Sequence, residues 1–170
     1  MAKLRRKGSV FTAPDFLDEP IEERVRIAQE EVLDDPAFNG FDVLALRNNM
    51  KFLSAIPGRT EFEVEILPHL CNKMGTLHGG AACTILDNLT STALFTIAKP
   101  GLLDGNHISR TITMTYLRPI PRGATARVVC QVMAAGQRTA NVRGELIYNG
   151  KVCATCIHDK AVLPRQESKL

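Results

Sequence analysis

The feature that most constrains the fold is an apolar run over residues 79–98 in which Asp87 is the only Asp, Glu, Lys or Arg. Its only other ionisable group is the thiol of Cys83. The run is long enough to cross a bilayer, but Asp87, Asn88 and several Ser and Thr residues make it too polar for that environment. We therefore predict a helix over residues 78–98 that is buried inside the protein.

The rest of the chain predicts one more helix and a series of strands. An amphipathic helix is expected over residues 20–34, with Ile21, Val25, Ala28 and Val32 on one face. Residues 37–50 are either irregular or contain a short helical turn. Strands are expected over 50–55, 60–67, 107–117, 124–134, 138–148 and 151–163.

Two of the predicted strands alternate clearly, and a third is defined by its turn. In 60–67, Phe62 and Val64 face inward and the three glutamates face outward. In 107–117, Ser109 shares one face with three Thr residues, opposite the apolar residues. Asn149-Gly150 predicts a tight hairpin between the last two strands. A strand pair, a long helix and about four further strands predict an α+β fold in which a curved antiparallel sheet wraps around a central helix.

Composition restricts the function. The 170 residues suffice for one domain, and a net charge of +3 is too small to indicate nucleic-acid binding. Five Cys residues without a secretory signal favour reduced thiols inside the cell. Cys153 and Cys156 lie three apart in a predicted strand, so they point to opposite faces, and no second Cys pair accompanies them; we therefore expect neither a metal nor another cofactor. The segment before Pro14 is basic, which favours a leader on a cytoplasmic protein, with mitochondrial import as the alternative.

Two features of the buried helix point to acid–base or hydrolytic chemistry. A carboxylate in an apolar segment is unfavourable unless it is paired, solvated or functional. The helix start at Gly79 offers unpaired N–H groups and the positive end of the helix dipole. Gly79 and Asp87 are eight residues apart, or about 12 Å along the axis. If both act on one substrate, two copies of the chain must share each site.

The motif N-x-x-G-x-x-H-G-G over residues 72–80, with Asp87 nine residues after its His, resembles the hotdog-fold acyl-CoA thioesterases. It is most similar to their phenylacetyl-CoA-type branch of small thioesterases. The resemblance extends over about residues 42–163 and includes residues 115–119 and 136–139. It implies a hotdog domain over residues 41–165, an N-terminal extension over 1–40 and a tail over 166–170.

The resemblance also implies roles for individual residues. Gly79 matches the backbone N–H that polarises the thioester carbonyl, and Asp87 matches the carboxylate from the other subunit that activates water or attacks directly. Asn72 and His78 match residues that orient the thioester and its loop, and Ser109 matches a hydroxyl that holds the water. Each also has a structural alternative: Asp87 as a hydrogen-bonded buried acid, Asn72 as a turn former, His78 as loop packing and Ser109 as an ordinary strand residue.

Coenzyme A carries phosphates, so cations should line its binding site. Arg138 and Lys160 are the first candidates, ahead of Arg110, Arg118 and Arg143. His107 and His158 are expected to be structural strand residues. The resemblance further implies a homodimer with one continuous sheet, often paired into a dimer of dimers, and no integral membrane segment. The alternatives in function are a hotdog hydratase or dehydratase, and a non-catalytic acyl-CoA-binding protein.

Overall fold

The computed structural model describes residues 15–33 and 40–163 of the chain. The basic leader before Pro14 and the tail over 166–170 fall outside the described residues, as does the side chain of Val32. The boundaries of the extension and of the hotdog domain stay predictions.

Six strands form one antiparallel sheet in the order β1-β2-β4-β5-β6-β3. Their bounds are β1 Met50–Ile56, β2 Arg59–Glu65, β3 His107–Tyr116, β4 Thr125–Ala135, β5 Thr139–Tyr148 and β6 Lys151–Val162. Every predicted strand is confirmed to within two residues at each end. The Asn149-Gly150 hairpin is confirmed as well, because both residues have positive φ, at 49° and 70°, as a type I′ turn requires.

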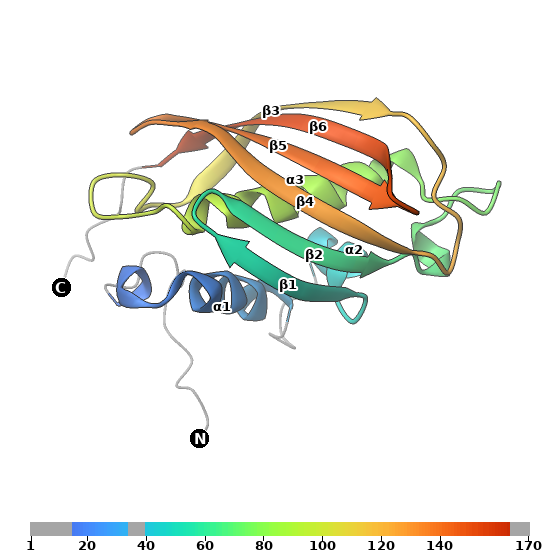
Figure 1. Ribbon diagram of the computed structural model, residues 1–170, viewed down its shortest axis with the longest axis horizontal. Coiled ribbons are helices and arrows are strands. Elements are labelled where there is room, and N and C mark those ends of the chain that lie inside the picture. The colour runs from blue at the N-terminus through green and yellow to red at the C-terminus, as the bar shows by residue number, and fades with distance from the viewer. Residues whose placement is uncertain (1–14, 34–39, 164–170) are drawn as a thin grey trace, which may run out of the picture.

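The sheet arches over one long helix, α3 (Gly79–Phe95), as Figure 1 shows. The buried face of α3 packs against inward-facing residues of the sheet such as Phe62, Val128 and Leu146. Helix and sheet come unusually close at Gly144 on β5, where an added Cβ would lie 2.9 Å from Cys156 Sγ and from Thr90 Cγ2. The absence of a side chain at that position therefore seats the helix in the curve of the sheet.

The predicted helix over 78–98 is real but ends early, at Phe95. The hydroxyl of Thr96 donates to the carbonyl of Ala93 at 2.6 Å and accepts the N–H of Gly58 at 2.7 Å. A side chain that bonds both ways with the backbone competes with the helical ladder, which explains the early end.

Two further helices pack beside this core. Helix α1 (Ile21–Leu33) confirms the predicted amphipathic helix, and it lies beside β1 in Figure 1. The short helix α2 (Phe41–Leu46) resolves the segment for which the sequence left two alternatives. Short 3-10 turns precede α1, at Phe16–Asp18, and follow β2, at Pro68–Leu70. Within the described ranges, no helix has the length and apolarity needed to span a bilayer.

One detail of the predicted alternation in β2 needs correction. The glutamates of β2 do lie on the face of the sheet opposite Phe62, but Glu61 is only 8% exposed. Its carboxylate pairs with the guanidinium groups of Arg59 and Arg127. Burial raises the pKa of Glu61, but the two hydrogen-bonded arginines outweigh burial and hold this pKa below its usual value.

Candidate active site

Asp87 lies midway along α3, where β3 and β6 cross the helix. Its side chain is 42% exposed in the isolated chain, so the carboxylate is neither sealed in the core nor free in solvent. The hydroxyl of Ser109 on β3 donates to Asp87 Oδ1 at 2.6 Å, which is short, as expected for a charge-assisted bond. The structure thus brings together two of the predicted site residues.

Ser109 reaches Asp87 because of a bulge that the sequence pattern did not reveal. Ser109 pairs with Lys160 of β6, but Thr111 pairs with Asp159, so two steps along β3 match one step along β6. The extra residue, Arg110, places Ser109 on the face of Lys160 and Thr111 on the opposite face. The prediction that Ser109 shares a face with the Thr residues of its strand is therefore wrong.

Two buried bases of β6 complete the surroundings of Asp87. His158 Nε2 lies 3.3 Å from Asp87 Oδ1, and Lys160 Nζ lies 3.9 Å from the same oxygen. His158 is fully buried and Lys160 is 3% exposed. His158 was expected to be a purely structural residue, but the structure places it against the carboxylate. Alternation along β6 could have revealed this placement, because positions 158 and 160 share a face.

The surroundings of His158 favour one protonation state of its ring. Burial first, and the charge of Lys160 second, lower the pKa of His158 to about 4, although Asp87 opposes this. The ring is therefore neutral at neutral pH and carries a single N–H. The Thr90 hydroxyl donates to the carbonyl of Leu86 at 2.7 Å, so Thr90 Oγ1, 2.8 Å from Nδ1, accepts the ring N–H at Nδ1. Nε2 faces Asp87 but makes no hydrogen bond within the described residues.

The two oxygens of Asp87 differ sharply in their surroundings. Ser109, His158 and Lys160 all approach Oδ1. In the part of the chain that the structure describes, no side chain or backbone group bonds Oδ2. One oxygen is therefore held in place, and the other can take a proton from water or attack a substrate.

The start of α3 forms the second half of the candidate site. The ring of His78 accepts the N–H of Gly80 at 2.9 Å through Nδ1 and so caps the helix. An added Cβ at Gly80 would lie 3.1 Å from this ring nitrogen, so the cap depends on glycine there. The N–H of Gly79 bonds no group among the described residues, which is the state expected of an oxyanion donor.

Tyr116 on β3 supports this helix start and was not among the predicted site residues. Its hydroxyl donates to the carbonyl of Gly79 at 2.9 Å, and an added Cβ at Gly79 would lie 3.3 Å from its ring. Burial raises the pKa of Tyr116, so the donating proton is retained. A Gly at position 79 is therefore needed for this close packing as well as for an accessible N–H.

Asn72 holds the loop in front of the helix. Its Oδ1 accepts the N–H of Met74 at 2.9 Å, and its Nδ2 donates to Thr76 Oγ1 at 3.0 Å. These bonds close an Asx-type turn and use the amide for loop structure. The placement agrees with the structural alternative for Asn72, although the turn also fixes the approach to His78.

The two predicted CoA cations lie in different environments. Arg138 is exposed at the turn before β5, where a cation can meet a phosphate. Lys160 points inward and lies with Ser109 and Asp87 instead of at a rim. Within the described ranges, no group of three or more His, Cys, Asp or Glu side chains could hold a metal ion.

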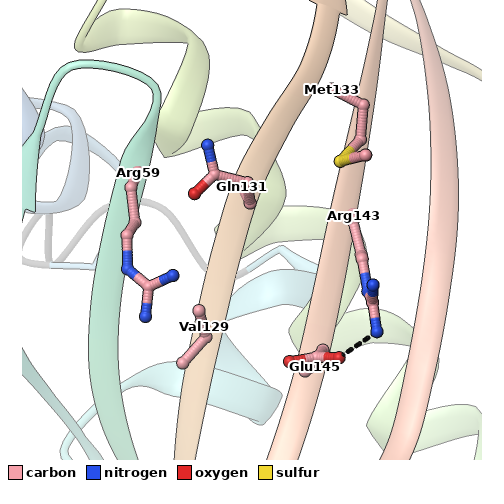
Figure 2. Close-up of a pocket in the computed structure, with 6 residues that line it drawn as sticks. All are labelled: Arg59, Val129, Gln131, Met133, Arg143 and Glu145. Carbon is pink, nitrogen blue, oxygen red and sulfur yellow. Dashed lines mark hydrogen bonds and ion pairs between the residues drawn. The ribbon is translucent and has the colours of Figure 1, made fainter.

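The outer face of the sheet carries a separate feature, shown in Figure 2. A shallow depression of about 210 Å³ is lined by Arg59, Val129, Gln131, Met133, Arg143 and Glu145. Of the residues predicted for the site, one of the lesser CoA candidates, Arg143, lines it. Its charges are already paired, since Arg143 bonds Glu145 and Arg59 bonds Glu61. This face is therefore suited to packing more than to chemistry.

Comparison with known proteins identifies relatives that match more than half of the chain. A family model described as the thioesterase superfamily matches residues 74–153. Acyl-coenzyme A thioesterase 13 of Homo sapiens is 30% identical over 112 residues, which cover 64% of this chain and 76% of the relative. The mouse enzyme of the same name is 27% identical over 125 residues, covering 71% of this chain and 84% of the relative.

Solved structures agree with these relatives. A zebra fish thioesterase superfamily member 2 has a TM-score of 0.71 and 25% identity, and the match covers 85% of this chain and 99% of that one. The phenylacetic acid degradation protein PaaI of Thermus thermophilus, in a mutant form, has a TM-score of 0.60 and 25% identity, covering 68% and 94% of the two chains. The predicted fold and the predicted family are both confirmed.

Proposed function

The chain belongs to the thioesterase superfamily and is a thioester hydrolase of the acyl-CoA thioesterase type, and we propose that Asp87 of one subunit and Gly79 of another act together in each of its active sites. The substrate is an acyl- or aryl-CoA, and the products are free CoA and a carboxylic acid. The observation that carries this proposal is the partly exposed carboxylate of Asp87, whose Oδ1 is held by a network of neighbours while its Oδ2 bonds no group among the described residues.

In this mechanism, Oδ2 of Asp87 removes a proton from water as the water oxygen attacks the thioester carbonyl. The N–H of Gly79 donates to the developing oxyanion, an effect worth about 2.7–4 kcal/mol in comparable sites. The carbon–sulfur bond then breaks, and the proton held by Asp87 passes to the departing CoA sulfur, which regenerates the carboxylate. Direct attack by the carboxylate is the alternative route.

Two observations support a site shared between subunits. Gly79 and Asp87 both lie on α3, about 12 Å apart along its axis, which is too far for one thioester carbon. Strand β3 is an edge strand with mostly exposed residues, so its backbone can pair with another copy. Such pairing would extend the sheet and bring a second α3 close. We place the packing of two dimers into a tetramer on the outer face that contains the Figure 2 depression.

For CoA recognition we retain Arg138, whose exposed position suits a phosphate contact. The buried position of Lys160 supports a different role.

We also retain the cytoplasm as the expected compartment, with mitochondrial import as the alternative. Fractionation of cells that express the full chain distinguishes the two.

Release of free thiol from a panel of acyl- and aryl-CoA substrates tests the activity. Hydrolysis of at least one of them is expected. Hydration of an enoyl-CoA without hydrolysis would instead indicate a hydratase, and binding without any turnover would indicate a non-catalytic acyl-CoA-binding protein.

Subunit mixing tests the shared site. One chain carries Asp87→Asn and the other carries Asn72→Ala, so a mixed dimer has one site with both parts intact. Random exchange should restore about a quarter of the wild-type sites, because half of the dimers are mixed and each has one intact site of two. If exchange is verified by mass spectrometry and activity does not recover, each site lies within one chain.

A further inference from the structure

Lys160 is a buried cation placed beside the proposed base. It is 3% exposed, and its ammonium nitrogen lies 3.3 Å from Ser109 Oγ and 3.9 Å from Asp87 Oδ1. Burying a charge is unfavourable unless it is paired, so this position requires a compensating interaction. A lysine that served only to hold the sheet together could be an apolar residue, like Ala140, which lies opposite it on β5.

The direction of the hydrogen bonds shows what Lys160 can do. An ammonium group only donates, so the bond from Nζ uses a lone pair of Ser109 Oγ. The single proton of Ser109 then points to Asp87 Oδ1, at 2.6 Å. The chain of donors from Lys160 through Ser109 to Asp87 therefore has one direction, and it ends on the oxygen opposite the free Oδ2.

The titratable groups around Lys160 come from three elements. Helix α3 contributes Asp87, with Cys83 near it, β3 contributes His107, and β6 contributes His158 and Cys156. Strand β5 places Ala140 opposite Lys160 and adds no charge there.

Among these groups, Asp87 is the one anion and Lys160 is the cation beside it; burial lowers the pKa of Lys160, and the charge of Asp87 opposes this. Burial raises the pKa of Cys83 and Cys156, so both thiols stay neutral. Asp159, the next residue along β6, alternates to the other face of the strand, where its carboxylate accepts from Asn141 at 2.7 Å. The ammonium group of Lys160 therefore has Asp87 as its counter-ion.

We propose that Lys160 is a positioning residue for hydrolysis: its buried ammonium group commits the Ser109 proton to Oδ1 of Asp87, which holds the carboxylate in place and leaves Oδ2 for water. This inference rests on the proposed function of Asp87. It differs from the CoA-phosphate role predicted from sequence, because Lys160 acts through Ser109 and not on the nucleotide.

The test compares Lys160→Met with Lys151→Met, an exposed lysine at the start of the same strand, as the matched control. Met preserves the length of the side chain and removes the charge, and replacing a buried charge by an apolar residue is often tolerated. We expect kcat to fall about 10- to 50-fold and KM to change by less than about twofold. A loss confined to kcat separates positioning of the reacting groups from binding of CoA, which would change KM.

A double-mutant cycle with Ser109→Ala isolates the proposed path. If Lys160 acts through Ser109, removing Lys160 from the Ser109→Ala enzyme should reduce kcat only about twofold further. Lys160→Gln, which retains a donor without charge, should give an intermediate kcat and serves as the second variant if Lys160→Met does not fold.

Two outcomes would overturn the inference: a raised KM with normal kcat, or fully additive effects in the cycle. Asp87→Asn is measured in parallel. If Asp87→Asn keeps normal activity, the proposed function of Asp87 fails; if it is inactive while Lys160→Met resembles wild type, only the inference about Lys160 fails.

Discussion

The two halves of helix α3 have opposite surroundings, although one continuous helix contains both. The first half, from Gly79 to Asp87, presents a free N–H and a partly exposed carboxylate. The second half ends in the core, because residues 92–95 are all buried. The helix therefore has an open end, at Gly79 to Asp87, and a closed end, at residues 92–95.

The closed end of α3 is held by one side chain of α1. The guanidinium of Arg24 donates to the carbonyls of Phe95 at 3.3 Å and Ala98 at 2.9 Å, just where the helix leaves its last acceptors unpaired. It also donates to the carbonyls of Leu17 at 2.5 Å and Glu19 at 2.8 Å. The difference between the two ends indicates a division of roles: the open end serves chemistry, and the closed end serves stability.

The largest expected effect comes from Asp87→Asn at the open end. The substitution preserves shape and removes the base, so hydrolysis should fall by about 10²–10⁴, the usual scale for a positioned acid or base. The melting temperature should change little. Asp159→Asn, which removes a carboxylate from the other side of β6, is the control. Near-normal turnover in a folded Asp87→Asn enzyme would reject the division of roles at its open end.

Arg24→Met should have the reverse effect. It removes four hydrogen bonds to backbone carbonyls and should lower the free energy of unfolding by about 2–4 kcal/mol, since bonds to charged groups are the stronger kind. Below the new transition temperature, kcat should stay within about twofold of wild type. Chemical denaturation followed by circular dichroism measures the first quantity, and thiol release measures the second.

Arg26→Met is the matched control for this experiment. Arg26 is an exposed arginine of the same helix whose guanidinium lies 4.9 Å from the centre of the Phe52 ring. Its loss should lower the free energy of unfolding by about 1 kcal/mol or less. Equal losses for the two variants would show that Arg24 does not have a special role at the end of α3.

The sequence predicted the open end far better than the closed end. The helix, the lone carboxylate and the glycine at the helix start are all local features, which periodicity and composition reveal. The bonds of Arg24 join residues more than seventy positions apart, and nothing in the spacing of α1 indicates them.

Within the site too, local sequence features predicted the residues, whereas contacts between distant segments were missed. Asp87 was predicted from its isolation in an apolar run, but its contacts with His158 and Lys160 depend on how β6 crosses α3. The place of Ser109 depends on a bulge, which shifts a strand by one residue without leaving a signature in its alternation. The pairing of strands that are distant in the sequence therefore determines these contacts, which local sequence patterns could not predict.

The pH dependence of stability tests the role of the closed end, through His107. His107 stacks on Phe95, with ring centres 5.3 Å apart, and burial lowers its pKa to about 4, with the charge of Lys160 acting in the same direction. Its pKa in the unfolded chain is about 6.5, so between these values the unfolded state binds more protons. Stability is therefore fully present above about pH 6.5 and is lost as the pH falls toward 4.

His107→Phe keeps a stacked ring and removes this titration. The loss of melting temperature between pH 7.5 and 5 should become smaller than in wild type at the same subunit concentration, while His158 still contributes. His69→Gln, at an exposed histidine, is the control and should leave the loss unchanged. An unchanged pH dependence in His107→Phe would show that His107 does not couple acid to the closed end.

The smallest expected effect concerns Arg138, and it tests whether the closed end of α3 is free of functional contacts. Arg138 precedes β5, whose first residue pairs with Ala161, next to the strand end that pairs with His107. If Arg138 binds a CoA phosphate there, a functional contact lies near the closed end of α3. Arg138→Ala should raise KM for acyl-CoA about three- to tenfold with kcat unchanged, a modest effect because an exposed ion pair is screened by solvent. A thioester analogue without the nucleotide should show no change in KM, and Arg122→Ala, at an exposed arginine that is not a candidate, is the control. Equal losses on acyl-CoA and on the truncated analogue would make Arg138 a structural residue, and the search for the phosphate site would move to Arg110, Arg118 and Arg143.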